Sequence, residues 1–411
     1  MRHSLSSFRN LGLVAGAAVL GLVATQVPVL GAVRTGSASG ARTAHTAPTF
    51  NVAQVLLGSS LSHTFTSTNS KSAITQPLSN IDDITQMGDH LFVVFQNGVG
   101  AMGEPSASGN PDSTVVELSL TGTVINQWNV TGRTDGIGTD PTHESVIVTV
   151  NEDGNSSLYV IRPEAPAASQ VTHYAYDGGL IHGGGTDSVS VVDGHVFISA
   201  SNPGTSTVSA PSATFPAVYS VDLVRSTLTA VLTPVFYDED AATIANAGDP
   251  KFGTSTNLAL TDPDSTEVVP SSSPRFGGDL LLTAQGDQQQ VYVSRPGTKH
   301  QKLTVLALSQ SVDDTAWATS ATGHLFSTDS VHDSVDVVTG PFSVGQTFVG
   351  VTPCNANAAT TGCPANYLAT LDLSSGAVTP VTLTGTAFTP KGALVFVPGD
   401  VHEVFGGERH R

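Results

Sequence analysis

The sequence has few cysteines, and this shortage limits the chemistry that it can carry. Only two of its 411 residues are cysteine, Cys354 and Cys363, and neither lies near the amino terminus. A bacterial lipoprotein anchor is therefore excluded, and a thiolate metal centre would need more soft ligands than this pair supplies. The two residues stand in the polar stretch TPCNANAATTGCPANY, so we predict a disulfide that closes a short loop.

Basic residues are also scarce. Lys and Arg number 16 against 34 Asp and Glu, which gives a formal net charge of -18. Such a surface repels nucleic acid and anionic lipid, so we expect neither as a partner. Charged residues make up only 12% of the chain, but 39% are hydrophobic and fall in short regular runs. This composition favours a packed β protein over a disordered one.

Long apolar segments are confined to the amino terminus. Arg2 and Arg9 precede an apolar run over 11–24, which is typical of a secretory signal peptide, and we expect cleavage near Ala32. An uncleaved anchor is the alternative, because 11–32 is long enough to span a membrane. We therefore expect a signal peptide over 1–32, a flexible lead-in over 33–50 and a secreted or cell-surface protein without stable membrane insertion.

Helical periodicity is almost absent after residue 50. Runs of four to eight Val, Leu, Ile, Phe, Thr and Tyr residues alternate with Gly, Asn, Asp and Pro, which indicates many strands. The runs repeat in groups of four, each opened by an acid: Asp83, Asp135 and Asp187 are 52 residues apart. Asn257 takes the fourth place and Asp314 the fifth, after longer intervals. Repeats of this kind predict a β-propeller of four-stranded blades.

The remaining strands fit one or two further blades, so the sequence favours seven blades, with six as the alternative. We expect strands from both chain ends to close the ring, because closure removes exposed sheet edges. We predict a single domain over 51–400, a disordered tail over 401–411 and a monomer.

The repeated acids should form part of a ring at one mouth of the central channel. One interpretation is structural: Asp at the start of a strand often accepts hydrogen bonds from backbone N–H groups. The other is that Asp83, Asp135, Asp187 and Asp314 hold Ca²⁺ or another divalent cation, the one cofactor that we consider. No other cofactor is indicated. Acids in TDPDSTE (261–267) are interpreted as a surface turn.

Polar loops should share the face that carries this ring. The loops between the second and third strands of each blade contribute seven such residues: Gln96, Asn97, Asn151, Glu152, Asp153, Gln285 and Asp287. Binding residues gather on loops of this kind, although Asn and Asp also serve simply as turn residues. His182, in LIHGGGTD, lies just before Asp187 and is a candidate base or ligand, or else a loop hydrogen-bonding group.

The chain resembles the propeller superfamily of NHL, YVTN and SMP-30/gluconolactonase-like proteins over roughly residues 75–400. The resemblance rests on the unit D-x-hydrophobic, then G-(H/D)-(L/V)-hydrophobic, then Y/V-x-hydrophobic-D/S. The scaffold and its polar loops favour an exported binding protein for a protein, peptide, glycan or small polar ligand. The alternative is a metal-dependent hydrolase or lyase of the lactonase or SMP-30-like type, as the resemblance suggests. SMP-30-like enzymes bind their metal through a Glu with Asn and Asp, and no equivalent Glu can be placed here. A quinoprotein-like oxidoreductase is a third alternative. No G-x-S-x-G, H-E-x-x-H or Walker motif is present.

Overall fold

The computed structural model describes residues 48–204, 207–354 and 363–399, and these residues form almost only β-strands. Two short 3-10 helices, η1 (Gly58–Ser60) and η2 (Ala167–Ser169), are the helical segments of this part of the chain. No helix within it is long and apolar enough to span a membrane. The predicted signal peptide, most of the lead-in and the tail over 401–411 lie outside the described residues.

Three four-stranded units follow one another along the chain, each in sequence order from β4, β8 or β12 outward. The first comprises β4 (Ile81–Met87), β5 (His90–Phe95), β6 (Asp112–Ser119) and β7 (Val124–Thr131). The second comprises β8 (Thr134–Asp140), β9 (Ser145–Val150), β10 (Ser157–Ile161) and β11 (Val171–Tyr176). The third comprises β12 (Gly185–Val192), β13 (His195–Ser201), β14 (Pro216–Val224) and β15 (Thr229–Tyr237). A short parallel pairing of β11 with β15 joins the last two into one eight-stranded sheet.

Three further sheets follow the first three units, besides a separate two-stranded hairpin. The fourth has the order β17 (Ser255–Asn257), β16 (Ala241–Ile244), β21 (Lys302–Ala307), β20 (Gln289–Ser294), β19 (Leu280–Ala284) and β18 (Pro263–Val268). The fifth has β22 (Val312–Trp317), β25 (Thr347–Val351), β26 (Tyr367–Leu371) and β27 (Val378–Pro380). The sixth has β28 (Thr382–Gly385), β1 (Thr49–Leu57), β24 (Ser334–Thr339), β23 (Gly323–Asp329) and β29 (Pro390–Pro398).

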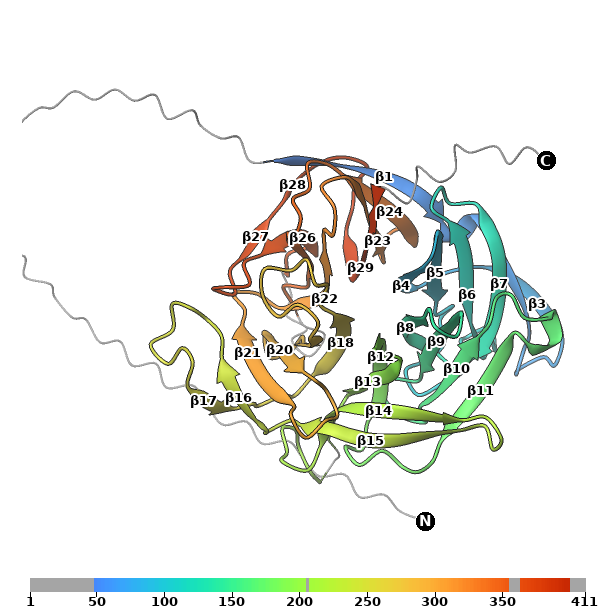
Figure 1. Ribbon diagram of the computed structural model, residues 1–411. Helices are drawn as coiled ribbons and strands as arrows, with labels where there is room; N and C mark the ends of the chain where they lie inside the picture. Colours follow the sequence, from blue (N-terminus) through green and yellow to red (C-terminus); the bar gives the residue numbers. More distant parts are fainter. Residues whose placement is uncertain (1–47, 205–206, 355–362, 400–411) are drawn as a thin grey trace, which may run out of the picture. The chain divides into compact units, whose positions relative to one another are not determined.

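One strand of each sheet contacts its counterparts in the two neighbouring sheets, and together these strands close a ring. The cycle of contacts runs β4, β8, β12, β18, β22, β29 and back to β4. Figure 1 shows these six strands around the centre, with the remaining strands of each sheet farther out. This arrangement is a β-propeller, as the repeats predict.

The ring has six innermost strands within the described residues, and not the seven that the sequence favours. The extra residues of the longer repeats form strands added to other sheets, such as β16 and β17, and supply no seventh sheet. The segment SAITQPL, expected in the closing blade, contains β3 (Ala73–Pro77), which pairs with β2 (Ser62–Thr66) in a separate hairpin.

Both ends of the described chain meet in the sixth sheet, as expected. β1 pairs with β24 on one side and with β28 on the other, while β29 pairs with β23. β1 begins at Thr49, two residues before the expected start of the domain at 51. The β23–β24 hairpin also lies in this sheet, although it separates β22 from β25 of the fifth sheet in the chain. The strands after Asp314 are therefore not consecutive members of one sheet.

The core fills the spaces between neighbouring sheets. Successive side chains of a strand point to opposite faces, and β9 shows the result. Val146 and Val148 pack with the first sheet through Phe92, while Ile147 packs with Val189 of the third. Because both faces of such a strand are covered, its sequence SVIVTV is apolar almost throughout.

The predicted disulfide is confirmed. Cys354 and Cys363 are joined with a Cα–Cα distance of 5.8 Å, and the residues between them lie outside the described part of the chain.

Candidate functional site

Five of the six innermost strands share one irregularity near their first residues. In β4, Ile81 pairs with Phe95 and Ile84 pairs with Val93, so three steps on β4 match two steps on β5. The same bulge occurs in β8, β12, β18 and β22. A bulge bends its strand and re-aims the extra side chains. The first residue inside each bulge is an aspartate: Asp82, Asp135, Asp187, Asp264 and Asp313.

The sixth strand places a lysine at this position. In β29, Pro390 pairs with Asp329 and Leu394 pairs with Ser327, and Lys391 is the first residue between them. Its Nζ lies 3.0 Å from Oδ1 of Asp82. The next residue is Gly392, where an added Cβ would clash with the side chain of Asp313. Only glycine allows this close approach of β29 to the neighbouring strand.

Asp83 and Asp314 occupy the second position inside their bulges, whereas Asp135 and Asp187 occupy the first. Their carboxylate oxygens accept hydrogen bonds from backbone N–H groups. Asp83 accepts hydrogen bonds from the N–H groups of Ile84, at 2.6 Å, and of Ile137 on β8, at 3.0 Å. Asp314 accepts them from Thr315, at 2.6 Å, and from Leu394 on β29, at 2.8 Å. Each of these two carboxyl groups therefore ties its strand to the next innermost strand.

Four of the five bulge aspartates are held differently, through their backbone carbonyl groups. Hydroxyl groups donate to these carbonyls: Thr328 to Asp82, Thr149 to Asp187, Ser188 to Asp264 and Ser265 to Asp313. In each case the donor belongs to a neighbouring unit of the ring. The backbone is thus positioned without the carboxyl groups, which remain available to face the channel.

This difference predicts opposite roles for neighbouring acids. At pH 5, Asp83→Ala should lower the free energy of unfolding by about 1–3 kcal/mol, because the buried N–H of Ile137 loses its acceptor. Asp264→Ala removes a carboxyl group whose Oδ2 has no hydrogen-bond partner among the described residues, and should cost less than about 1 kcal/mol. Urea unfolding of both variants makes the comparison. Equal losses would show that Asp83 has no special structural role.

The bulge aspartates line a cavity of about 270 Å³ at the ring. Its walls include eleven of the 34 acidic residues of the whole chain, together with two basic ones, Arg133 and Lys391. The acidic lining residues are Asp82, Asp83, Asp135, Glu152, Asp153, Asp187, Asp262, Asp264, Glu267, Asp313 and Asp314. The cavity therefore carries a strong excess of carboxyl groups in a chain that has few charges elsewhere.

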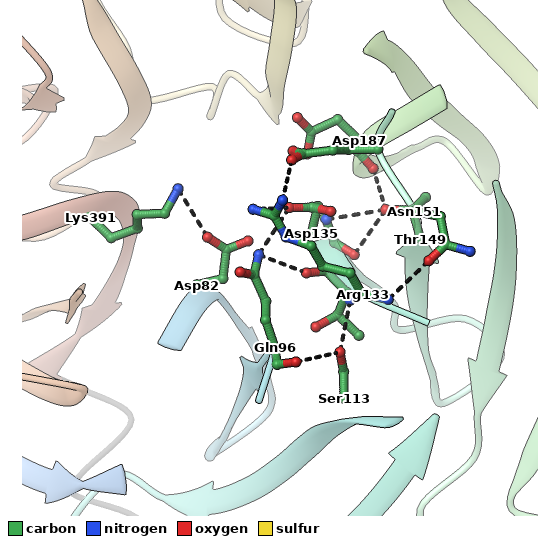
Figure 2. A network of polar contacts seen from close by, with 12 residues as sticks. Asp82, Gln96, Ser113, Arg133, Asp135, Thr149, Asn151, Asp187 and Lys391 are labelled. Atoms are coloured by element: carbon green, nitrogen blue, oxygen red, sulfur yellow. Dashed lines mark hydrogen bonds and ion pairs between the residues drawn. The ribbon is translucent and has the colours of Figure 1, made fainter. Parts of the chain in front are cut away.

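The two basic side chains form ion pairs on one side of the cavity, and the charge of Lys391 also lowers the pKa of Asp313, against the larger effect of burial. Arg133 lies 2.6 Å from Glu152 and 3.7 Å from Oδ1 of Asp135, and Gln96 donates to the same oxygen at 3.0 Å. Figure 2 shows Arg133, Asp135 and Gln96 together with the Lys391–Asp82 ion pair. Asn151 fixes the backbone before β8, since its Oδ1 accepts from the N–H of Arg133 at 3.0 Å. Oδ2 of Asp135 has no hydrogen-bond partner among the described residues, although Asp135 is only 4% exposed.

The other side of the cavity brings three carboxyl groups together. Side-chain hydrogen bonds connect Asp264 with Asp187 and with Asp313, from three consecutive innermost strands. Burial, and then the charges of Asp313 and Asp187, raise the pKa of Asp264 well above its usual range. Burial raises the pKa of Asp187 to about 7 and that of Asp313 to about 6. A proton shared among these carboxyl groups relieves the repulsion between their charges.

His182 is placed in the core and not in the cavity lining. Its Nε2 donates to the carbonyl oxygen of Gly185 at 2.6 Å, and its Nδ1 accepts from the hydroxyl of Tyr219 at 2.8 Å. The side chain is fully buried, and burial lowers its pKa. Both ring nitrogens are thus used in holding the segment that leads into β12.

The loop residues predicted for the site are only partly brought together. Glu152 and Gln285 line the cavity. Asp287 instead holds Thr261, accepting from its N–H at 2.7 Å and from its hydroxyl at 2.6 Å. Asn257 ends β17, at the edge of the fourth sheet opposite β18, so Asp264 takes the place assigned to it.

Sequence reasoning missed the central acids for identifiable reasons. Asp264 and Glu267 lie on β18, in the segment that was interpreted as a surface turn. Asp82 and Asp313 are each followed by a second aspartate, and the 52-residue spacing selects the wrong member of the first pair. The spacing of 53 residues from Asp82 to Asp135 was the signal in the sequence that could have identified Asp82. Nothing in the sequence marks Lys391.

The predicted metal ligands do not fit a metal centre. Asp83 and Asp314 already accept backbone N–H groups with both oxygens, and Oδ1 of Asp135 accepts from Gln96. Among residues 48–204, 207–354 and 363–399, no group of three or more His, Cys, Asp and Glu side chains is arranged to hold a metal ion. We derive no chemistry through a metal for this site.

Comparisons with known proteins give distant likenesses. No protein-family model and no curated protein sequence matches the chain. The periplasmic gluconolactonase PpgL of Pseudomonas aeruginosa is 11% identical over 85% of this chain and 99% of its own, with a TM-score of 0.38. The β-propeller domain of Cps50 (Swd1) from Myceliophteria thermophila is 10% identical over 68% and 95%, with a TM-score of 0.36. Hydrazine synthase from Kuenenia stuttgartiensis is 12% identical over 72% of this chain and 63% of its own, less than two thirds, with a TM-score of 0.35.

Proposed function

We propose that this β-propeller is a binding protein whose channel holds a ligand that carries a cationic nitrogen. The observation that carries the proposal is the row formed by Asp187, Asp264 and Asp313. They occupy the first bulge position of three consecutive innermost strands, line the cavity, and form no ion pair with a basic side chain among the described residues. Oδ2 of Asp264 has no hydrogen-bond donor among the described residues.

Crowded carboxyl groups need a proton or a cation between them. In the unliganded protein a proton shared among the three carboxyl groups serves this purpose. An alkylammonium group supplies three N–H donors and a positive charge, so it can replace the proton and satisfy the oxygens of Asp187 and Asp313 together. The excess of eleven acidic over two basic side chains in the lining attracts such a ligand and repels anions.

The cellular setting belongs to the same proposal. The apolar run over 11–24 and the Cys354–Cys363 disulfide both fit a protein that is exported to an oxidising compartment. We do not carry forward the metal-dependent hydrolase, because Asp83 and Asp314, two of its four proposed ligands, hold neighbouring strands instead.

Titration calorimetry with n-butylamine, at pH 8 and low ionic strength, tests the proposal. We expect the amine to bind and butyrate, its counterpart of opposite charge, not to bind. Asp187→Asn/Asp313→Asn removes the two carboxylates that are ionised at this pH, and should weaken amine binding at least about tenfold, or ~1.4 kcal/mol.

The matched control is Asp222→Asn, an exposed carboxylate on β14 outside this cavity, which should bind the amine like the unmodified protein. Absence of amine binding by the unmodified protein, or the same weakening in both variants, would contradict the proposal.

A further inference from the structure

A second cavity lies away from the one that the bulge aspartates line. It has a volume of about 320 Å³ and is lined from β8, β9, β10 and β11 in the second unit and from β13 and β14 in the third. Asp135 and Asp187 stand near the first residues of β8 and β12, whereas this cavity is lined by Asp140, the last residue of β8, and by Gly194, just after β12. This cavity, here called the intersheet groove, therefore lies at the opposite ends of these strands. Among the described residues it shares no lining residue with the acidic cavity.

The floor of the intersheet groove is apolar. Ile147, Val160, Val196 and Val221 pack in one core cluster, and none of the four is more than 7% exposed. Leu223 is partly buried against the same cluster. Since these side chains already fill the space beneath the groove, a ligand contacts only their outer surface. A flat, rigid body suits such a floor, because it covers the surface with one face and loses little conformational freedom on binding.

Tyr174 brings a hydroxyl group to the same floor. The residue is 1% exposed and belongs to the core cluster beneath the groove. Its hydroxyl makes no hydrogen bond with another described residue. A buried Tyr hydroxyl usually has a hydrogen-bond partner. An acceptor oxygen of a ligand in the groove would provide one.

Two guanidinium groups from different sheets line the groove. Arg162 directly follows β10, Arg225 directly follows β14, and neither forms an ion pair with a described residue. Two acids line it as well. Asp140 is already engaged, since its Oδ1 accepts from the N–H of His143 at 3.3 Å and its Oδ2 lies 2.6 Å from Nδ1 of the same residue. Asp222 is exposed, so two guanidinium groups face one carboxylate without a partner of its own, in a chain whose net charge is -18.

We propose that the intersheet groove binds a small aromatic carboxylate. The ring of the ligand lies against Val196 and Val221, and its carboxylate accepts hydrogen bonds from Arg162, Arg225 and the hydroxyl of Tyr174. A guanidinium group offers parallel donors that match a planar carboxylate, so the two arginines supply both charge and orientation. This site is independent of the amine site proposed for the channel.

Titration calorimetry with benzoate at pH 8, on the whole protein, tests this inference. Benzamide has the same ring and nearly the same shape but no charge, and should bind at least about tenfold more weakly. Butyrate carries the carboxylate without the ring, so it should not bind measurably.

Substitutions in the groove separate the contributions. Arg162→Gln/Arg225→Gln should weaken benzoate binding at least about tenfold, whereas Arg295→Gln, at an exposed arginine outside the groove, should leave it unchanged. Tyr174→Phe keeps the ring and removes only the hydroxyl, so it should weaken binding about fivefold. Asp222→Asn removes a like charge beside the ligand and should strengthen binding about two- to threefold.

Benzamide binding as tight as that of benzoate, or unchanged benzoate binding in Arg162→Gln/Arg225→Gln or in Tyr174→Phe, would overturn the inference. Equal weakening by Arg295→Gln would show a general effect of charge and would overturn it as well. Asp187→Asn/Asp313→Asn should bind benzoate like the unmodified protein, and a loss in that variant would place the ligand in the channel instead. The amine proposal stands or falls separately, because none of the three aspartates on which it rests lines the groove.

Discussion

Raising the pH from 5 to 8 should lower the free energy of unfolding of this protein by several kcal/mol. In the folded state the pKa of Asp313 is raised to about 6, that of Asp187 to about 7 and that of Glu267 to about 8. The folded protein therefore binds more protons than the unfolded chain, and deprotonation favours unfolding. The stabilisation is complete below about pH 4 and is lost as the pH passes through 6 to 8. At ~1.4 kcal/mol per unit of pKa, Asp187 alone contributes on the order of 4 kcal/mol.

Urea unfolding at half-unit intervals from pH 5 to 8, in buffers without amines or divalent cations, measures this dependence. Asp187→Asn/Asp313→Asn should flatten the curve, because it removes two of the groups that titrate in this range. Asp222→Asn should leave the curve unchanged. Stability that is constant or rises over this range would show that the buried carboxyl groups do not carry the expected protons.

Addition of an ammonium ligand at pH 8 should recover part of the lost stability, since a ligand that binds only the folded state stabilises it. The pH profile therefore also provides a simple screen for ligands of the cavity.

Phe50→Ala should destabilise the protein by about 3–5 kcal/mol. Phe50 lies on β1, is 1% exposed, and its ring centroid is 5.4 Å from that of Phe342 and 5.6 Å from that of Phe348. Phe348 belongs to β25 of the fifth sheet, whereas β1 lies in the sixth. The substitution leaves a cavity where the strand from the amino-terminal end closes the ring.

The control is Phe252→Ala, because Phe252 is 53% exposed and its loss should change stability by no more than about 0.5 kcal/mol. Urea unfolding of both variants at pH 5 makes the comparison. Similar small effects of the two substitutions would show that β1 contributes little to closure.

The local pattern of the chain was sufficient for much of the architecture. The first three units were predictable strand by strand, because each consists of consecutive hairpins whose partners are near in sequence. The disulfide followed from a single cysteine pair, and closure by both chain ends followed from the need to cover sheet edges. Asp135 and Asp187 were placed at the channel because they open strands that repeat at a fixed interval.

The rest depended on pairings between distant segments. The β23–β24 hairpin joins a sheet with β1 and β29, and no local signal distinguishes this from continuing the fifth sheet. A shift of one residue in a strand changes the side to which a side chain points. The exact register of the bulges therefore decided which aspartate of each pair, Asp82–Asp83 and Asp313–Asp314, takes the first bulge position. Asp264 and Lys391 lack a repeat signal, and only their strands' places in the ring bring them to the other acids. The sequence by itself thus determined a repeated all-β ring with acids at its centre, whereas the tertiary structure decided which carboxyl groups accept hydrogen bonds from the backbone of a neighbouring strand and which do not.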